Sequence, residues 1–218
     1  MGAETNPFCG RRAFLRKSAL ATIGGGAAMA ALAPSAHAAK RVRTVVIDAG
    51  HGGHDVGAHK GLVFEKHLNL DTARRVEREL KKRGYKTVMT RSKDVFIPLL
   101  TRAKIGNKYR DSVFVSIHYN HTWKTAVTGL ETFYYSYSGY QLASKVQTHL
   151  LKKLKGVNRG VKRARFSVLR NTKYPSILVE GGFISNTTER KKLMQAWYRQ
   201  AVAESVAAGV EDYKRTAR

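Results

Sequence analysis

The sequence predicts a single α/β domain with a twisted, mostly parallel or mixed central sheet of about six strands flanked by helices. Short apolar runs alternate with helical patterns along residues 40–218. No linker, low-complexity tract or internal repeat interrupts this stretch. The composition, 43% hydrophobic and 25% charged, is ordinary for a globular protein and argues against wholesale disorder and against a multi-span membrane protein.

Six segments have the pattern of strands. The first, residues 42–48, is an apolar run that ends in a Gly-rich turn at residues 49–53. A run of this kind is typical of a strand buried on both faces. Residues 112–119 are strongly apolar in the same way, and residues 130–137 are rich in aromatic side chains. The other expected strands are residues 85–90, 166–169 and 176–180, the last two lying on either side of Pro175.

Four regions have the periodicity of helices. An apolar stripe with helical spacing runs through residues 68–80, and Gly84 follows it as a residue favoured just past a helix C-terminus. Ser138 and Gln141 have the spacing of a capping box ahead of a stripe that extends to Leu154. The other expected helices are residues 98–109 and a C-terminal helical region, capped by Asn186 with Glu189, that extends to about residue 213.

Residues 1–38 have the pattern of a bacterial twin-arginine signal peptide. Paired arginines at positions 11 and 12 are followed by Phe14-Leu15 and by a Gly- and Ala-rich apolar run over residues 19–33. A basic tail before a transmembrane anchor is the alternative, but the run is too short and too rich in Gly and Ala to span about 30 Å of hydrocarbon. We therefore expect cleavage after Ala38, a mature domain of residues 39–218, and a location in the periplasm or cell envelope.

The chain is strongly basic. It has 40 Lys and Arg against 15 Asp and Glu, a net charge of +25, and removal of residues 1–38, with four basic residues and one acidic residue, leaves +22. Such a protein is drawn to polyanions. The single cysteine, Cys9, lies in the signal segment, which excludes a disulfide, a thiolate metal cluster and a cysteine nucleophile from the mature chain. Composition leaves two classes open, a polyanion-binding module and an enzyme that acts near polyanions.

Ionisable side chains stand at the carboxyl ends of the expected strands. His51, His118 and Glu180 each end or follow one of these strands, and Glu65 opens the first helix. Ligands of open α/β sheets bind outside the carboxyl ends of the strands, so these groups can converge. Two imidazoles and one carboxylate, with a water, make an open catalytic zinc site. A further carboxylate that is not a ligand would then transfer protons.

Each of these residues also has a purely structural explanation. The helix dipole favours a glutamate such as Glu65 in a first turn, and His118 could be an edge histidine that bonds to backbone. The Gly-rich turn could be a simple turn or an anion cradle. The sequence has no P-loop, no H-E-x-x-H and no G-x-S-x-G motif. Spacing alone therefore leaves the chemistry open.

Four ordered segments resemble the zinc-dependent N-acetylmuramoyl-L-alanine amidase family. They are residues 46–58 (VIDAGHGGHDVGA), 65–70 (EKHLNL), 116–120 (SIHYN) and 178–186 (LVEGGFISN), and the likeness covers residues 43–213. The resemblance implies that His51, Glu65 and His118 bind one zinc ion. It also implies that Glu180 is the general base and acid. The expected reaction is hydrolysis of the amide between N-acetylmuramic acid and L-alanine, which releases stem peptides during cell-wall remodelling, cell separation or recycling.

The sequence departs from the family pattern at a few positions. Ala49 stands where Pro is usual, Gly106 where Ala is usual, and Tyr119 where Ala is frequent. None of these changes removes an expected ligand, although Tyr119 with His121 could reshape the substrate groove. The candidates for substrate contact are His54, Asn120, His121 and Arg102.

The expected partner is peptidoglycan, with electrostatic contact between the basic surface and an anionic wall polymer or membrane. Residues 120–129 are too few for the helical plug that covers the zinc in some relatives, so we expect no obligatory activator. We also expect a monomer that binds no nucleic acid. The alternatives are a zinc carboxypeptidase or deacetylase on a similar sheet, and a non-catalytic basic module with no need of all four site residues.

Overall fold

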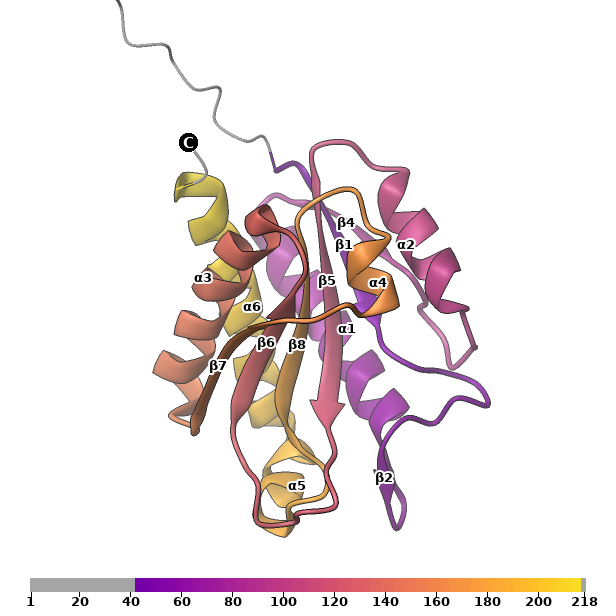
Figure 1. The fold of residues 1–218 in the computed structure, drawn as a ribbon, viewed down its shortest axis with the longest axis vertical. Coiled ribbons are helices and arrows are strands. Elements are labelled where there is room, and N and C mark those ends of the chain that lie inside the picture. Colours follow the sequence, from indigo (N-terminus) through magenta and orange to yellow (C-terminus); the bar gives the residue numbers. More distant parts are fainter. Residues whose placement is uncertain (1–41, 217–218) are drawn as a thin grey trace, which may run out of the picture. The chain divides into compact units, whose positions relative to one another are not determined.

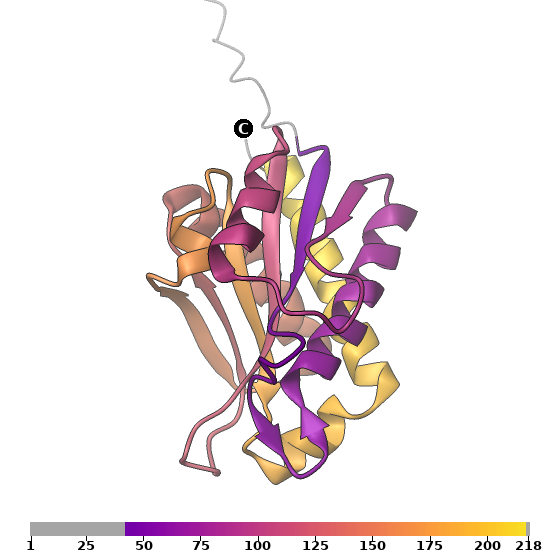
Figure 2. The ribbon, with the colours of Figure 1, turned by 90° about the vertical axis from the view of Figure 1, so that its right-hand side faces the viewer.

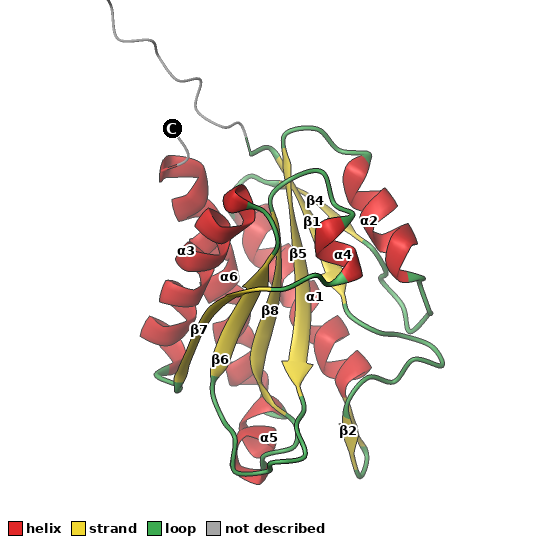
Figure 3. Cartoon of the chain, in the orientation of Figure 1, coloured by secondary structure: helices red, strands yellow, loops and turns green. Residues whose placement is uncertain are grey.

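The computed structural model describes residues 42–216, which form three layers with a six-stranded sheet in the middle (Figures 1 and 3). β6 pairs antiparallel with β8, and the other neighbouring strands are parallel. This confirms the prediction of one α/β domain with a mostly parallel or mixed sheet. The expected signal peptide, residues 1–38, lies outside the described residues. In spatial order the strands are β4 (Lys86–Met89), β1 (Thr44–Ala49), β5 (Ser112–Asn120), β8 (Ser176–Phe183), β6 (Leu130–Tyr134) and β7 (Asn158–Arg163).

Helices cover both faces of the sheet (Figures 1 and 2). One face carries α1 (Glu65–Lys82), α3 (Tyr137–Leu154) and α6 (Ala196–Thr216), and the other carries the shorter α2 (Leu99–Asn107) and α4 (Ser167–Arg170). At the end of the domain where β1, β5 and β8 finish lie α5 (Thr187–Leu193) and a hairpin of β2 (His59–Lys60) and β3 (Val63–Phe64). Within residues 42–216, no helix has both the length and the apolar character needed to cross a membrane.

The two helical layers explain why β1 is apolar at almost every position. Val45 and Ile47 belong to the larger core beneath α1, α3 and α6, whereas Val46 packs with Phe114 and Leu178 in the smaller core beneath α2 and α4. Successive side chains of a strand point to opposite faces, so a strand covered on both sides needs apolar residues throughout. The two cores thereby fix the register of β1, β5 and β8, and with it the positions of their carboxyl ends.

One expected strand is wrong. Residues 166–169 do not form a strand, because Ser167–Arg170 is the short helix α4, and the sixth strand is β7. A four-residue apolar run does not distinguish a strand from a helical turn. β7 escaped notice because its sequence, NRGVKR, is polar, which suits an edge strand that is half exposed and pairs with β6 alone.

The helix boundaries differ from expectation at one cap and agree at another. Ser136, not Ser138, caps α3, and its side chain accepts a hydrogen bond from the N–H of Gly139. The expected cap at Asn186 is confirmed, because its side chain accepts from the N–H of Glu189. The C-terminal helical region is divided into α5 and α6.

Candidate metal centre and active-site cavity

The carboxyl ends of the three central strands lie side by side. In the parallel pairing of β1 with β5, Ala49 is opposite Ile117, and His51 follows two residues later on the turn after β1. In the parallel pairing of β5 with β8, His118 is opposite Glu180. Residues in register on neighbouring strands project from the same face of the sheet. The sheet therefore brings the side chains of His118 and Glu180 to one place.

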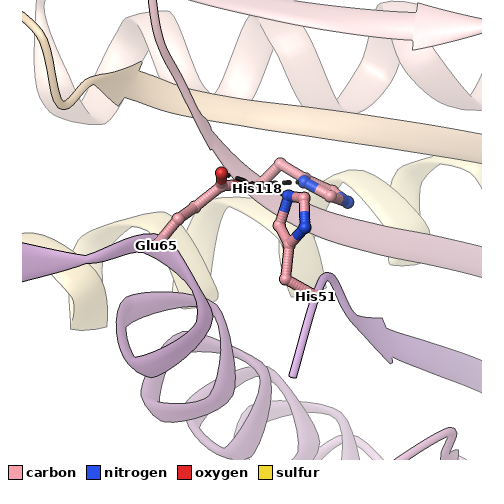
Figure 4. A group of neighbouring side chains, drawn as sticks. All are labelled: His51, Glu65 and His118. Atoms are coloured by element: carbon pink, nitrogen blue, oxygen red, sulfur yellow. Dashed lines mark hydrogen bonds and ion pairs between the residues drawn. The ribbon is translucent and has the colours of Figure 1, made fainter. Parts of the chain in front are cut away.

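His51, Glu65 and His118 converge from the turn after β1, the start of α1 and the end of β5 (Figure 4). One ligand atom from each lies within 4.8 Å of the others. The His51 Nε2 is 3.1 Å from Glu65 Oε2, and the His118 Nδ1 is 2.8 Å from Glu65 Oε1. Two imidazoles and one carboxylate are donors that a borderline transition metal accepts. The three side chains can therefore hold a metal ion.

The backbone around this group is built for close approach. A Cβ on Gly50 would lie 2.2 Å from Cε1 of His118, and a Cβ on Gly57 would lie 2.6 Å from Glu65 Oε2. His51 itself has a φ of 60°, in the left-handed region that a non-glycine residue rarely adopts. Strain of this kind persists where the surrounding structure enforces it, and it is frequent at functional sites.

Replacement of Gly50 by Ala is expected to lower metal affinity about 10- to 100-fold, as other losses of ligand support do. The new methyl group would push the His118 ring out of place, because it would lie 2.2–2.8 Å from three atoms of that ring. Gly156→Ala is the matched control, since its Cβ would meet only Leu130 at 3.2 Å. Metal titration of both variants tests this, and equal affinities would show that His118 moves without loss.

Further polar groups hold the three side chains in place. Asp55 Oδ1 lies 2.8 Å from His51 Nδ1, so the ring donates there and leaves Nε2 directed at Glu65. The Asn69 amide donates to Glu65 Oε1 at 3.2 Å and to the Gly50 carbonyl at 3.1 Å. Such outer contacts fix the tautomer and orientation of metal ligands. The sequence reasoning missed Asp55 and Asn69, although each follows the residue it supports by four positions.

Charges within the group favour the ionised form of Glu65. Burial alone would raise the pKa of Glu65, but hydrogen bonds and charges from His118 and His51 outweigh it and hold this pKa far below its usual range. Burial would lower the pKa of His51, but Glu65 and Asp55 outweigh it and raise this pKa. Glu65 is therefore an ionised carboxylate, the form that a metal ligand requires.

Glu180 lies beside this group and has a different environment. Its Oε2 is buried and has no hydrogen-bond partner among the described residues. Burial raises the pKa of Glu180 well above its usual range, and the nearby charges of Glu65 and Glu131 raise it further. A carboxyl group with a raised pKa holds its proton more readily than an ordinary glutamate, which suits a group that must both accept and donate a proton.

A cavity of about 460 Å³ joins these groups. Its polar side includes His51, Asp55, His118 and Glu180, and its apolar wall comes from the approach to α2, from α4 and from β8. A concave apolar site with a few convergent polar groups is the usual form of an active site. The apolar lining residues are Phe96, Leu99, Phe166, Val168 and Leu178.

Arg102 lines the cavity, but its guanidinium is buried and bonded to the protein itself. It donates to Asp48 Oδ1 at 2.9 Å, to the Ala49 carbonyl at 2.7 Å and to the His51 carbonyl at 2.8 Å. These bonds tie α2 to the turn that carries His51. They favour a role for Arg102 in positioning this turn, and its expected contact with substrate stays a prediction.

The other expected substrate residues lie around the site. The Asn120 side-chain amide donates to Glu131 Oε1 at 2.6 Å, and its Oδ1 accepts from the N–H of His121 at 2.7 Å. His54 is exposed, and its ring centroid is 4.1 Å from that of Phe96, which lines the cavity. The His121 side chain is exposed at the start of the loop after β5. Substrate contact by these three residues stays a prediction.

Comparison with known proteins identifies the family. The chain matches the N-acetylmuramoyl-L-alanine amidase family over residues 45–212. It is 39% identical over 188 residues to the uncharacterized protein YqiI of Bacillus subtilis, covering 84% of this chain and 91% of that one. It is 37% identical over 176 residues to the amidase LytC of the same organism, covering 79% of this chain but 36% of LytC.

A solved structure agrees. An N-acetylmuramoyl-L-alanine amidase from Clostridium difficile 630 superimposes with a TM-score of 0.78 at 34% identity, covering 82% of this chain and all of that one. The fold and the sequence thus indicate the same family. The chain belongs to the N-acetylmuramoyl-L-alanine amidase family, the enzymes that cleave an amide bond of peptidoglycan.

Proposed function

We propose that this enzyme is zinc-dependent and hydrolyses the bond between N-acetylmuramic acid and L-alanine in peptidoglycan. The observation that carries the proposal is the convergence of His51, Glu65 and His118 at a cavity that Glu180 also lines. The donor set suits a single zinc ion with a coordination position left open. The Oε2 of Glu180 has no hydrogen-bond partner among the described residues, so it is available to accept and donate a proton.

The chain's own residues supply the proton transfers and the orientation. Zinc, when held by the three side chains, polarises the scissile carbonyl and makes water more acidic. Glu180 removes the proton of the attacking water and delivers it to the nitrogen of the leaving L-alanine. Asp55 and Asn69 keep two of the ligands oriented through their hydrogen bonds. No serine or cysteine nucleophile is needed.

The apolar wall provides the place for substrate. Phe96, Leu99 and Phe166 are 41–55% exposed and line the cavity opposite the polar groups. Their contact with the sugar and peptide would exclude bulk water, which strengthens the electrostatic interactions within the site. We therefore expect the wall to hold the substrate while the polar side carries out the reaction.

Purified protein is expected to release intact stem peptides from isolated sacculi with no second protein added, and a chelator should reduce this to background. Mass spectrometry of the products separates the alternatives, because a carboxypeptidase would remove only the terminal residue and a deacetylase would release acetate. A non-catalytic module would release nothing. Unchanged turnover after verified removal of metal would contradict the zinc proposal, and a strict need for another protein would contradict the absence of an activator.

We further propose that the enzyme acts in the cell envelope, where its substrate lies, after twin-arginine export and removal of residues 1–38. Some of the basic side chains are clustered in the sequence, for example Lys152, Lys153 and Lys155; Arg159, Lys162, Arg163 and Arg165; and Arg190, Lys191 and Lys192. Some of these charges are used inside the protein, since Lys153 pairs with Glu204, and Arg159 and Lys162 pair with Glu131. The exposed remainder is available to an anionic wall polymer.

Binding to intact sacculi is expected to weaken steeply as salt increases, because surface charges are screened over about 8 Å at physiological ionic strength. Hydrolysis of a small soluble muropeptide should change much less. Pull-down of the zinc-loaded Glu180→Gln variant with sacculi, across a salt series, measures binding without turnover. Binding that is equal at low and high salt would assign the anchoring to the active-site cavity instead.

A further inference from the structure

Three segments project together from the end of the domain where β1, β5 and β8 finish. They are the β2–β3 hairpin (residues 59–64), the β5–β6 loop (residues 121–129), and α5 with the first turn of α6 (residues 187–197), and we name them the hairpin end. Figures 1 and 2 place all three at the same end of the described chain. Hydrogen bonds fasten the loop to the α5 segment, from Thr122 N–H to Ser185 Oγ at 3.2 Å and from Asn186 Nδ2 to the Thr125 carbonyl at 2.8 Å.

The hairpin end exposes large apolar side chains on each segment. Leu62 is 93% exposed at the hairpin tip, and Trp123 is 82% exposed on the loop. Met194, just after α5, and Trp197, at the start of α6, are 54% and 61% exposed. A groove of about 270 Å³ lies between Leu62 and Met194. Exposed apolar groups that gather at one end indicate an interaction surface.

The charges of the hairpin end have one sign. Lys60, Lys124, Lys191 and Lys192 are exposed, and Lys124 lies over the Trp123 ring, 4.8 Å from its centroid. The three segments contain one acidic residue, Glu189, which is buried and accepts hydrogen bonds from the N–H groups of Phe183 and Gly129. The described segments therefore present apolar tips and lysines with no exposed carboxylate among them. The carboxylate that lines the groove, Asp71 of α1, is paired with Arg75 and Arg199.

This combination fits a lipid surface better than a protein partner. Tryptophan and lysine side chains favour the interface between headgroups and acyl chains, where the ring or the methylene stem is buried and the polar tip stays in water. Each lysine near an anionic bilayer adds to the attraction. The cores of protein interfaces, in contrast, are depleted in lysine, whereas here lysines flank the apolar tips.

We propose that the hairpin end binds the surface of an anionic lipid bilayer. Leu62, Trp123 and Trp197 enter the interfacial layer, and the lysines contact the lipid phosphates. The proposal concerns binding alone and does not depend on zinc or on hydrolysis. Since the metal-binding group lies at the same end of the sheet, docking would hold the active site against the peptidoglycan nearest the membrane.

The chain carries its own reporters for this test, because Trp123 and Trp197 are its only two tryptophans. The full chain is mixed with vesicles of phosphatidylglycerol and phosphatidylcholine, or of phosphatidylcholine alone, and tryptophan emission is recorded. We expect a blue shift, and quenching by lipids brominated on the acyl chain, with the anionic vesicles only. Contact between lipid and any other segment would leave the emission unchanged.

Variants distinguish the electrostatic contribution of the lysines to lipid binding from the apolar contribution of the tryptophans. Sedimentation with anionic vesicles should show at least about a tenfold loss of partition for K124A/K191A/K192A, and a similar loss for W123A/W197A. The matched control, K104A/K108A/R110A, removes the same charge from α2 and the turn before β5, and its binding should change less than about threefold, as expected for charges beyond a Debye length of the lipid. All variants should hydrolyse a soluble muropeptide at the rate of the unmodified chain, which verifies their fold.

Three outcomes would overturn the proposal: an equal emission shift with neutral vesicles, sedimentation of the full chain without an emission shift, or full partition of the W123A/W197A variant. A blue shift in the absence of lipid, with self-association, would identify the hairpin end as a protein interface instead. Loss of hydrolysis with intact vesicle binding would count against the proposed function alone.

Discussion

Replacement of Glu180 by Gln is expected to lower the rate of muropeptide hydrolysis by about 10²- to 10⁴-fold, the usual contribution of a general base and acid. The amide has the shape of the carboxyl group but cannot accept the proton of water. The bound zinc should stay near one equivalent, because Glu180 lies outside the group formed by His51, Glu65 and His118. Turnover kinetics and metal analysis of the same preparation measure both effects.

The stability of this variant provides a second test. A buried carboxyl oxygen without a partner destabilises a fold, so a neutral amide at position 180 should leave the melting temperature unchanged or raise it. Glu131 is the matched control, because it lies opposite Glu180 in the β6–β8 pairing and its carboxylate is bonded to Asn120, Arg159 and Lys162. Glu131→Gln should lose about 1 kcal/mol of stability, since two of its partners are partly exposed, and should keep most of its activity.

The Glu180→Gln and Glu131→Gln variants together test the assignment of Glu180 as the general base and acid. Loss of zinc from the Glu180→Gln variant would require the ligand and base assignments to be exchanged. Equal loss of activity in Glu131→Gln and Glu180→Gln would mean that the carboxylate pair acts as one unit, and that the proton transfer does not belong to Glu180 alone.

The position of the site could be predicted because it depends on short-range rules. A continuous apolar run defines a doubly covered strand, and the residue after it must lie at the edge of the sheet. His118 and Glu180 were placed in this way, and the structure sets them opposite each other on β5 and β8. Glu65 was placed by its position at the start of a helix, and α1 begins there.

What could not be predicted depends on contacts between distant segments. β7 has no apolar signal, because its stability comes from pairing with β6 rather than from burial. The burial of Arg102 follows from the packing of α2 against the turn after β1, so nothing in the sequence indicated its bonds to Asp48 and to backbone carbonyls. The net charge of the chain also gave no indication that Arg159 and Lys162 pair with Glu131.

The loss of a metal ligand is expected to have the other large effect. His118→Ala and His51→Ala should each lose both the bound zinc and the hydrolysis of muropeptides, because two remaining ligands seldom hold zinc. His149→Ala is the matched control, since this histidine pairs with Asp212 between α3 and α6. The control variant should retain its bound zinc and its activity.

The Asp55→Asn variant distinguishes the loss of a metal ligand from the loss of a residue that orients one. The Asp55 carboxylate accepts the Nδ1–H of His51, so the amide would weaken the orientation of the ring without removing a ligand. Zinc affinity should fall about 10- to 100-fold, and excess zinc should restore turnover. No excess of zinc should restore turnover of the His118→Ala variant, because that variant lacks the imidazole donor atom. If His118→Ala still bound one equivalent of zinc, the metal would have to be held elsewhere, whereas rescue of neither variant would show that Asp55 acts on the substrate or on a proton instead of on His51.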